Sequence, residues 1–178
     1  MNRLHRSLLK FIRRHGLVQP GSRLVLGFSG GPDSVALALL LRDLAQGDLP
    51  MELHLAYLNH GLRGEESEAE ERFVRQFAAK HDLPLSVDRL QELEEQQGSL
   101  EGNARQARYA FLLRTAEQAG APAVATAHHA DDVAESVLQR LIRGAGVQGL
   151  AAIRPSRRLA PESTVRLVRP LLETRKED

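Results

Sequence analysis

The chain has 178 residues, a formal net charge of +1 and no cysteine. The length suits one domain with a sizeable core, and the small net charge means that any nucleic-acid surface is a local patch. Without cysteine, the chain cannot form a disulfide scaffold, a thiol nucleophile, a zinc–thiolate site or an iron–sulfur cluster. No stretch is long and apolar enough to span a membrane, and the N-terminus lacks the apolar core of a signal peptide, so we expect a cytoplasmic protein.

The first predicted element is an amphipathic helix over residues 3–14, in which large apolar side chains alternate with basic ones. We interpret it as a helix that docks on the domain with a solvated basic face; a direct RNA contact is the alternative. A Pro-Gly turn at 20–21 then leads into an apolar run over 23–28, which predicts the first strand.

The turn after this strand, residues 29–34, reads Ser-Gly-Gly-Pro-Asp-Ser and leads into an apolar helix that ends near residue 46. Two adjacent glycines let the backbone approach a bulky anion because no Cβ stands in the way. The helix directs its free N–H groups and the positive end of its dipole to the same place, and proline is tolerated at a helix start. The residues that we expect to hold a nucleotide phosphate are Ser29, Gly30, Gly31, Pro32 and Ser34.

Asp33 is the exception in this turn, because a carboxylate beside a bound phosphate is repelled. A divalent cation between the two groups removes the conflict, so we interpret Asp33 as a Mg2+ contact. The alternative is an ordinary glycine turn in which Asp33 or Ser34 caps the helix. The Walker pattern G-x-x-x-x-G-K-S/T and its lysine are absent, which argues against an enzyme that acts on the γ-phosphate.

Residues 51–58 predict a second strand, and Asn59 and His60 stand at its end. This tip is expected at the carboxyl edge of the sheet, where α/β folds bind ligands. A helix with a glutamate-rich first turn follows, and acids there suit the helix dipole without any further function. Residues 84–88 predict a short third strand, and 91–98 predict a polar loop or a frayed helix.

A long helix is predicted from about residue 99 to 118, and it carries Arg105 and Arg108 three residues apart on one face. Two guanidinium groups at this spacing can hold phosphate oxygens. A surface helix with a salt bridge to Glu101, one turn earlier, explains the same residues without a ligand.

The predicted strand over 122–127 is followed at once by His128-His129-Ala130-Asp131-Asp132 and a further helix. Adjacent histidines and adjacent aspartates do not match the spacing of a zinc site. On the helix, Asp131, Asp132 and Glu135 can share one side, where they repel one another unless a cation lies among them. That cation is Mg2+, an ammonium substrate or both; alternatively, Asp131 is an N-cap and the other acids serve the helix dipole.

The segment from 137 to 161 has no acidic residue but several arginines, which makes it a candidate surface for an RNA backbone. Its arginines are Arg140, Arg143, Arg154, Arg157 and Arg158. Residues 165–168 predict the last strand. Strands that alternate with helices indicate a three-layer α/β fold with a mainly parallel five-stranded sheet and helices on both faces.

The 29–34 turn matches the S-G-G-x-D-S signature of the PP-loop ATP pyrophosphatases, which cleave ATP between its α- and β-phosphates and hold the pyrophosphate in this loop. Across almost its whole length the chain resembles one branch, the tRNA(Ile)-lysidine synthetases. The resemblance includes 59–63 (Asn-His-Gly-Leu-Arg). Its most specific part is 128–135 (His-His-Ala-Asp-Asp-Val-Ala-Glu) followed by 140–146 (Arg-Leu-Ile-Arg-Gly-Ala-Gly). A branch that thiolates tRNA with cysteines does not fit a chain without cysteine.

This resemblance implies an adenine nucleotide alpha hydrolase-like fold over residues 1–178, a single catalytic domain without the tRNA-binding domains into which family members continue. It implies ATP and Mg2+ as cofactors, and tRNA(Ile) and free L-lysine as substrates. The 2-oxygen of the wobble cytidine attacks the α-phosphorus and pyrophosphate leaves; the lysine ε-amine then attacks C2 and AMP leaves.

The resemblance also assigns roles. Asp33 and Asp132 are expected at Mg2+, Arg105 or Arg108 at the α-phosphate or the adenylated base, and the adenine near Asn59 and His60. The residues expected on the lysine and tRNA side are His129, Asp131, Glu135, Arg140 and Arg143. Two other functions stay open, another PP-loop ligase and a non-catalytic nucleotide- or RNA-binding module, and the sequence leaves a homodimer open.

Overall fold

The computed structural model describes residues 3–59, 65–90, 100–144 and 153–177. Within these residues the helices are α1 (Arg3–His15), α2 (Pro32–Ala45), α3 (Glu65–Lys80), α4 (Leu100–Gln118) and α5 (Ala130–Ile142). The strands are β1 (Arg23–Gly27), β2 (Glu52–Asn59), β3 (Leu85–Arg89), β4 (Ala123–Ala125), β5 (Ser156–Arg158) and β6 (Arg166–Val168). None of the described helices combines the length and the apolar character that crossing a bilayer requires.

The strands form one sheet in the order β3-β2-β1-β4-β6-β5, and every pair is parallel except β5 with β6. The prediction of a three-layer α/β fold with a mainly parallel sheet is confirmed. The sheet has one strand more than the five predicted, because β5 lies inside the arginine-rich segment. Its sequence, Ser-Arg-Arg, has no apolar alternation, and its pairing with β6 at the sheet edge is set by tertiary context rather than by local propensity.

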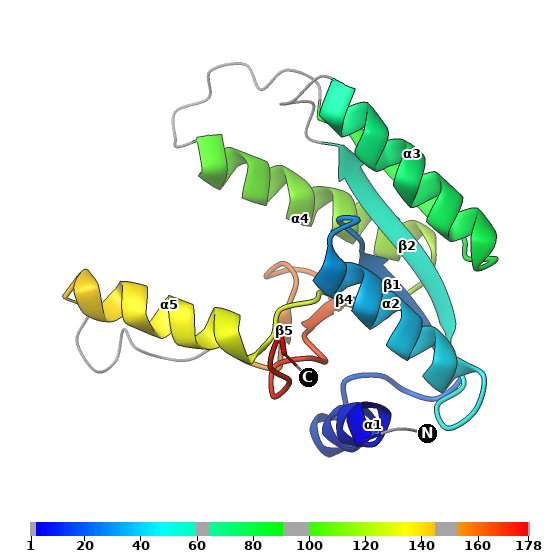
Figure 1. Ribbon diagram of the computed structural model, residues 1–178, viewed down its shortest axis with the longest axis horizontal. Helices are drawn as coiled ribbons and strands as arrows, with labels where there is room; N and C mark the ends of the chain where they lie inside the picture. Colours follow the sequence, from blue (N-terminus) through cyan, green and yellow to red (C-terminus); the bar gives the residue numbers. More distant parts are fainter. Residues whose placement is uncertain (1–2, 60–64, 91–99, 145–152, 178) are drawn as a thin grey trace.

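Helices cover both faces of the sheet (Figure 1). Leu24 and Leu26 of β1 point into a core formed with α1, α2 and α3, whereas Val25 points into a second core formed with α4. These three β1 side chains are fully buried, as expected of a parallel strand that is covered on both sides. The prediction that the first helix docks on the domain is confirmed by its buried residues, which are Leu8, Leu9, Phe11 and Ile12.

The order of the strands creates a crevice beside β1. The chain runs from β1 outward to β2 and β3, then returns to β4 on the other side of β1. β1 and β4 are parallel neighbours, with Leu26 opposite Ala125, so their following loops leave the same edge of the sheet in different directions. Ligands of open α/β sheets bind at such a switch in strand order.

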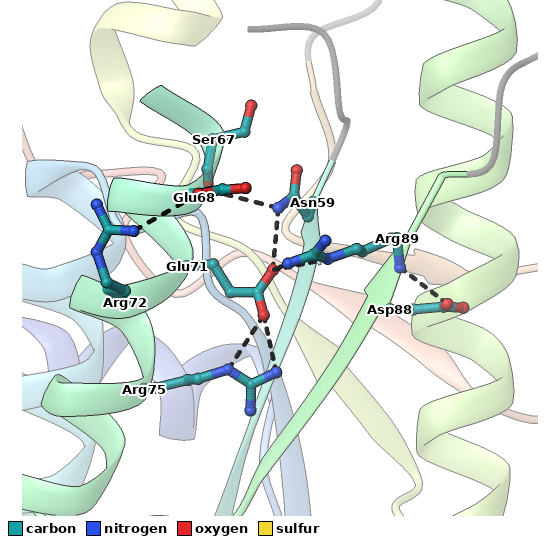
Figure 2. A network of polar contacts seen from close by, with 8 residues as sticks. All are labelled: Asn59, Ser67, Glu68, Glu71, Arg72, Arg75, Asp88 and Arg89. Carbon is teal, nitrogen blue, oxygen red and sulfur yellow. Dashed lines mark hydrogen bonds and ion pairs between the residues drawn. The ribbon is translucent and has the colours of Figure 1, made fainter. Parts of the chain in front are cut away.

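A buried glutamate joins the ends of β2 and β3 to α3, and Figure 2 shows the network around it. Asn59 donates to a Glu71 carboxylate oxygen at 3.0 Å and to the Ser67 carbonyl at 3.4 Å. Arg75 donates to the other Glu71 oxygen at 2.8 and 3.1 Å, and Arg89 donates to the first at 3.1 Å. The hydrogen bond from Asn59 is the largest of the causes that lower the pKa of Glu71 to about 2, followed by that from Arg75.

We predict that Glu71→Gln lowers the free energy of unfolding by about 1–3 kcal/mol at pH 7, because an amide cannot accept all of these hydrogen bonds. A carboxyl pKa of about 2, below its ordinary 4.5, stabilises the fold above pH 4.5, and this stabilisation disappears as the pH falls towards 2. The difference between the two proteins should therefore shrink between pH 5 and pH 2 in urea titrations.

The control is Glu68→Gln, three residues earlier on α3. Glu68 is exposed and lies 3.8 Å from Arg72 (Figure 2), so its loss should cost less than about 0.5 kcal/mol. Equal losses in both variants, or a Glu71→Gln effect that does not change with pH, would contradict the role given to Glu71.

Candidate active site

The loop between β1 and α2 is shaped by its glycines. Gly30 has a φ of +79°, a conformation that favours glycine, and a Cβ there would lie 3.4 Å from Val74 and 3.5 Å from Phe73 of α3. Gly31 is extended and caps α2, and Pro32 occupies the first turn. The sequence-based prediction of a glycine loop leading into a helix is therefore confirmed.

Two serine hydroxyls form hydrogen bonds within this loop. The Ser34 hydroxyl is buried and donates to the Gly31 carbonyl at 2.9 Å, and the Ser29 hydroxyl donates to Ser34 at 3.2 Å. The first N–H groups of α2 have no partner inside the helix, and the helix dipole adds partial positive charge at this end. The loop therefore offers backbone amide donors to an anion.

A cavity of about 410 Å³ opens between this loop and the loop after β4. It lies at the switch point between β1 and β4 and has the size of an ordinary small-molecule site. The polar residues on its wall include Ser29, Asp33, Ser34, Arg108, His128 and Asp132. Five of these six residues belong to the two predicted motifs, 29–34 and 128–135, and the sixth, Arg108, comes from α4.

His129 connects the two loops. Its ring is 8% exposed, and its Nε2 lies 3.7 Å from a carboxylate oxygen of Asp33. Its Nδ1 lies 3.4 Å from Asp131 and 3.6 Å from Asp132, without a hydrogen bond of normal geometry within the described residues. One buried imidazole thus contacts the acids of both motifs, so the two strand-to-helix edges form one pocket, as the sequence predicts.

The three acids of the second motif do not all reach the cavity. Asp132 lines the cavity and accepts a hydrogen bond from the backbone N–H of His129 at 2.8 Å. Asp131 accepts the backbone N–H of Lys176 at 2.8 Å, and Glu135 accepts from the Gln139 side chain at 3.1 Å. Neither Asp131 nor Glu135 belongs to the cavity wall. Among the described residues, no three His, Asp or Glu side chains are arranged to hold a metal ion.

The predicted basic residues separate in the same way. Arg108 lines the cavity, whereas Arg105 is exposed outside it. Arg140 and Arg143 lie at the far end of α5, which has no buried residue and extends away from the sheet (Figure 1).

Asn59 is buried in the network around Glu71, next to the cavity residues Tyr57 and Leu58. His60 lies outside the described residues.

His128 and Thr126 also belong to the site, although neither was assigned to it from the sequence. The His128 Nδ1 lies 2.9 Å from the Thr126 hydroxyl. Burial, followed by the positive charge of Arg169, lowers the pKa of His128 to about 4, so its imidazole is neutral at pH 7. Both residues directly follow β4, and the rule that ligands bind at the carboxyl edge of parallel strands identifies them.

Comparisons with known proteins agree with this geometry. A family model described as a PP-loop domain matches residues 1–178. The chain is 46% identical over 171 residues to a tRNA(Ile)-lysidine synthase of Symbiobacterium thermophilum, a match that covers 95% of this chain and 35% of that protein. It is 48% identical over 149 residues to the protein of the same name in Geobacter sulfurreducens, covering 82% and 31%. The chain spans about a third of the length of these curated relatives.

Two solved structures share the fold. A U34-tRNA thiolase from Methanococcus maripaludis gives a TM-score of 0.77 at 20% identity, covering 97% of this chain and 58% of that one. An NH3-dependent NAD synthetase from Campylobacter jejuni gives 0.59 at 16% identity, covering 99% and 69%. With the Ser-Gly-Gly-Pro-Asp-Ser loop at the switch point of the sheet, the chain belongs to the PP-loop domain family.

Proposed function

We propose that this chain is the ATP-pyrophosphatase domain of a tRNA(Ile)-lysidine synthase. The reaction joins L-lysine to C2 of the wobble cytidine in a CAU anticodon and releases AMP and pyrophosphate. The observation that carries the proposal is the contact of one buried imidazole, His129, with Asp33 of the phosphate loop and Asp132 of the second motif. The names and identities of the relatives support the choice of branch.

In the first step, the loop from Ser29 to Ser34 holds the pyrophosphate that leaves when the cytidine 2-oxygen attacks the α-phosphorus. Arg108 is placed to neutralise charge that develops on the α-phosphate. The adenine is expected along β2, where Tyr57 and Leu58 reach the cavity.

Mg2+ fits two of the cavity carboxylates, Asp33 and Asp132, because it binds one or two carboxylates together with phosphate oxygens and water. When bound, it would neutralise charge on the departing pyrophosphate. The lack of a preassembled three-residue metal cluster in the described residues agrees with an ion that arrives with the nucleotide.

In the second step, the lysine ε-ammonium must lose a proton before it can attack C2. We assign the acceptance of that proton to Asp132, a carboxylate on the cavity wall. The new C–N bond replaces the C2–O bond to AMP. We assign His129, Asp131 and Glu135 to the approach of the lysine and Arg140 and Arg143 to the tRNA.

The direct test measures products. With ATP and Mg2+, the chain should release AMP and pyrophosphate only when both L-lysine and tRNA(Ile) with a CAU anticodon are present, and mass analysis of the tRNA nucleosides should show cytidine plus lysine minus water. Release without tRNA, or equal release with other amino acids, would point to a different PP-loop ligase. ATP binding without any release would point to a non-catalytic module.

We predict that Asp33→Asn lowers AMP release by about 100-fold or more, because a neutral amide is a weaker Mg2+ ligand than a carboxylate and the charge on the departing pyrophosphate is then less well neutralised. The matched control is Asp43→Asn, which removes an acid from the same helix at an exposed position beside His5 and Arg42. Activity like that of the unmodified chain is expected for the control. Normal turnover in the Asp33→Asn variant would show that Asp33 is not part of the site.

We also predict that Gly30→Ala weakens ATP binding, because alanine is strained at a φ of +79° by about 1–2 kcal/mol. Calorimetric titration should show a Kd about 5- to 30-fold higher if the loop changes conformation to relieve this strain. Gly47→Ala is the control, because Gly47 has open space around its Cβ position and follows the other end of α2. The same Kd in both variants would contradict the prediction.

A further inference from the structure

Three guanidinium groups surround the ring of Tyr109 on α4. Arg105 and Arg108 of the same helix lie 5.3 and 5.5 Å from the ring centre. Arg157, which comes from β5 at the edge of the sheet, lies 5.3 Å from it. These are cation–π distances. The ring thus brings together arginines from two elements that are far apart in the sequence.

A fourth arginine, Arg169, lies near Tyr109 and is buried. Arg169 directly follows β6, is 4% exposed and donates to the Arg154 carbonyl at 2.7 Å. Its Nε and the Tyr109 hydroxyl are both buried, and the two side chains lie against each other, because a hydrogen bond with Tyr109 is among the interactions of the Arg169 guanidinium. Arg169 therefore adds a buried positive charge beneath the ring.

The charge of this cluster is unbalanced. Among the side chains that the structure describes, which do not include that of Glu101, none of the four arginines forms an ion pair with a carboxylate. Burial raises the pKa of Tyr109, but the surrounding arginines outweigh it and hold that pKa below its ordinary value. A strongly positive potential therefore exists at the hydroxyl, and an anion there would relieve the repulsion among the guanidinium groups.

The cluster lies at the same sheet edge as the cavity. Val168 of β6 pairs with Ala125 of β4, so Arg169 leaves the sheet beside Thr126, the first cavity residue after β4. Arg108 belongs to both places, because it lines the cavity and also lies over the Tyr109 ring. Arg105 and Arg157 face solvent and are not part of the cavity wall.

We propose that the exposed Arg105 and Arg157, gathered around Tyr109 above the buried Arg169, form a phosphodiester site that holds the RNA backbone next to the nucleotide entering the cavity. This inference rests on the proposed function, in which the second substrate is an RNA. Guanidinium forks bind phosphate oxygens in pairs, and the exposed arginines make the site accessible to a chain too large for the cavity. The α-phosphate of ATP has the same chemistry, so the test separates the two sources.

The test uses Arg157→Gln and measures two affinities on the same protein: tRNA(Ile) binding by fluorescence anisotropy without ATP, and ATP binding by calorimetry without RNA. We expect the Kd for tRNA to rise about 5- to 10-fold, and the slope of log Kd against log salt to fall by about one. The Kd for ATP should stay unchanged. Arg157→Lys should also weaken tRNA binding, because lysine keeps the charge but loses the planar fork.

The matched control is Arg158→Gln, at the next position of β5. Arg158 is also exposed, donates to the Pro161 carbonyl at 3.2 Å and has no cation–π contact with Tyr109. The Kd of the Arg158→Gln variant for tRNA should therefore change by less than about 2-fold. Equal losses in Arg157→Gln and Arg158→Gln would mean a general basic surface and would overturn the site.

The remaining outcomes are also decisive. A higher Kd for ATP with unchanged tRNA binding would assign the cluster to the nucleotide phosphate instead, and a chain that does not bind tRNA at all would refute the inference. Failure of the proposed function is seen separately, as AMP release that does not depend on lysine, because neither binding assay contains lysine.

Discussion

The site depends on the parallel pairing of β1 with β4. Because the two strands are neighbours and point the same way, the phosphate loop and the His-His-Ala-Asp-Asp motif leave one edge of the sheet side by side. Their following helices, α2 and α5, then run in different directions (Figure 1), and the cavity is lined by the two loops together with the end of β2 and α4. The contact of His129 with Asp33 spans this junction. A change that slipped the register of β4 would move Asp132 and leave the phosphate loop intact but without its partner.

Charge is divided along this edge of the sheet. Asp33, Asp131 and Asp132 gather around His129 on one side, and the arginines around Tyr109 gather on the other. His128 lies between the two groups, and burial together with Arg169 keeps it neutral. Such a division suits a reaction with a cationic amine and anionic phosphates, because each reactant finds opposite charge on its own side. The two halves come from different strands, so the fold rather than any single motif creates the gradient.

Most of the fold is predictable from the sequence, because β1, β2 and β4 are apolar runs that end in glycine or polar turns. The strand β5 is not, since Ser156–Arg158 has no apolar pattern and pairs only through its neighbour β6. In the site, the position of Asp33 and Asp132 just after neighbouring parallel strands predicts that both line one pocket. The sequence does not predict that Asp131 accepts a hydrogen bond from the backbone of Lys176. The roles of Tyr109 and Arg169 escape sequence reasoning, because each is defined by contacts between α4, β5 and β6 that have no local signature.

Two acids on the cavity wall, Asp33 and Asp132, are supported to different extents by the rest of the fold. Asp33 begins α2, which buries Leu37 and Leu41 completely in the core. Asp132 begins α5, in which no residue is buried and Leu138, Leu141 and Ile142 are exposed. In the described part of the chain, α5 packs on the core through the half-buried Val133. A helix of this length with so little packing is marginal in water, so α5 should exchange its amide hydrogens long before α2 does. The second acid is thus held mainly by its own first turn, where Ala130 donates to the Thr174 carbonyl, and a fraying of the outer turns would leave that anchorage in place.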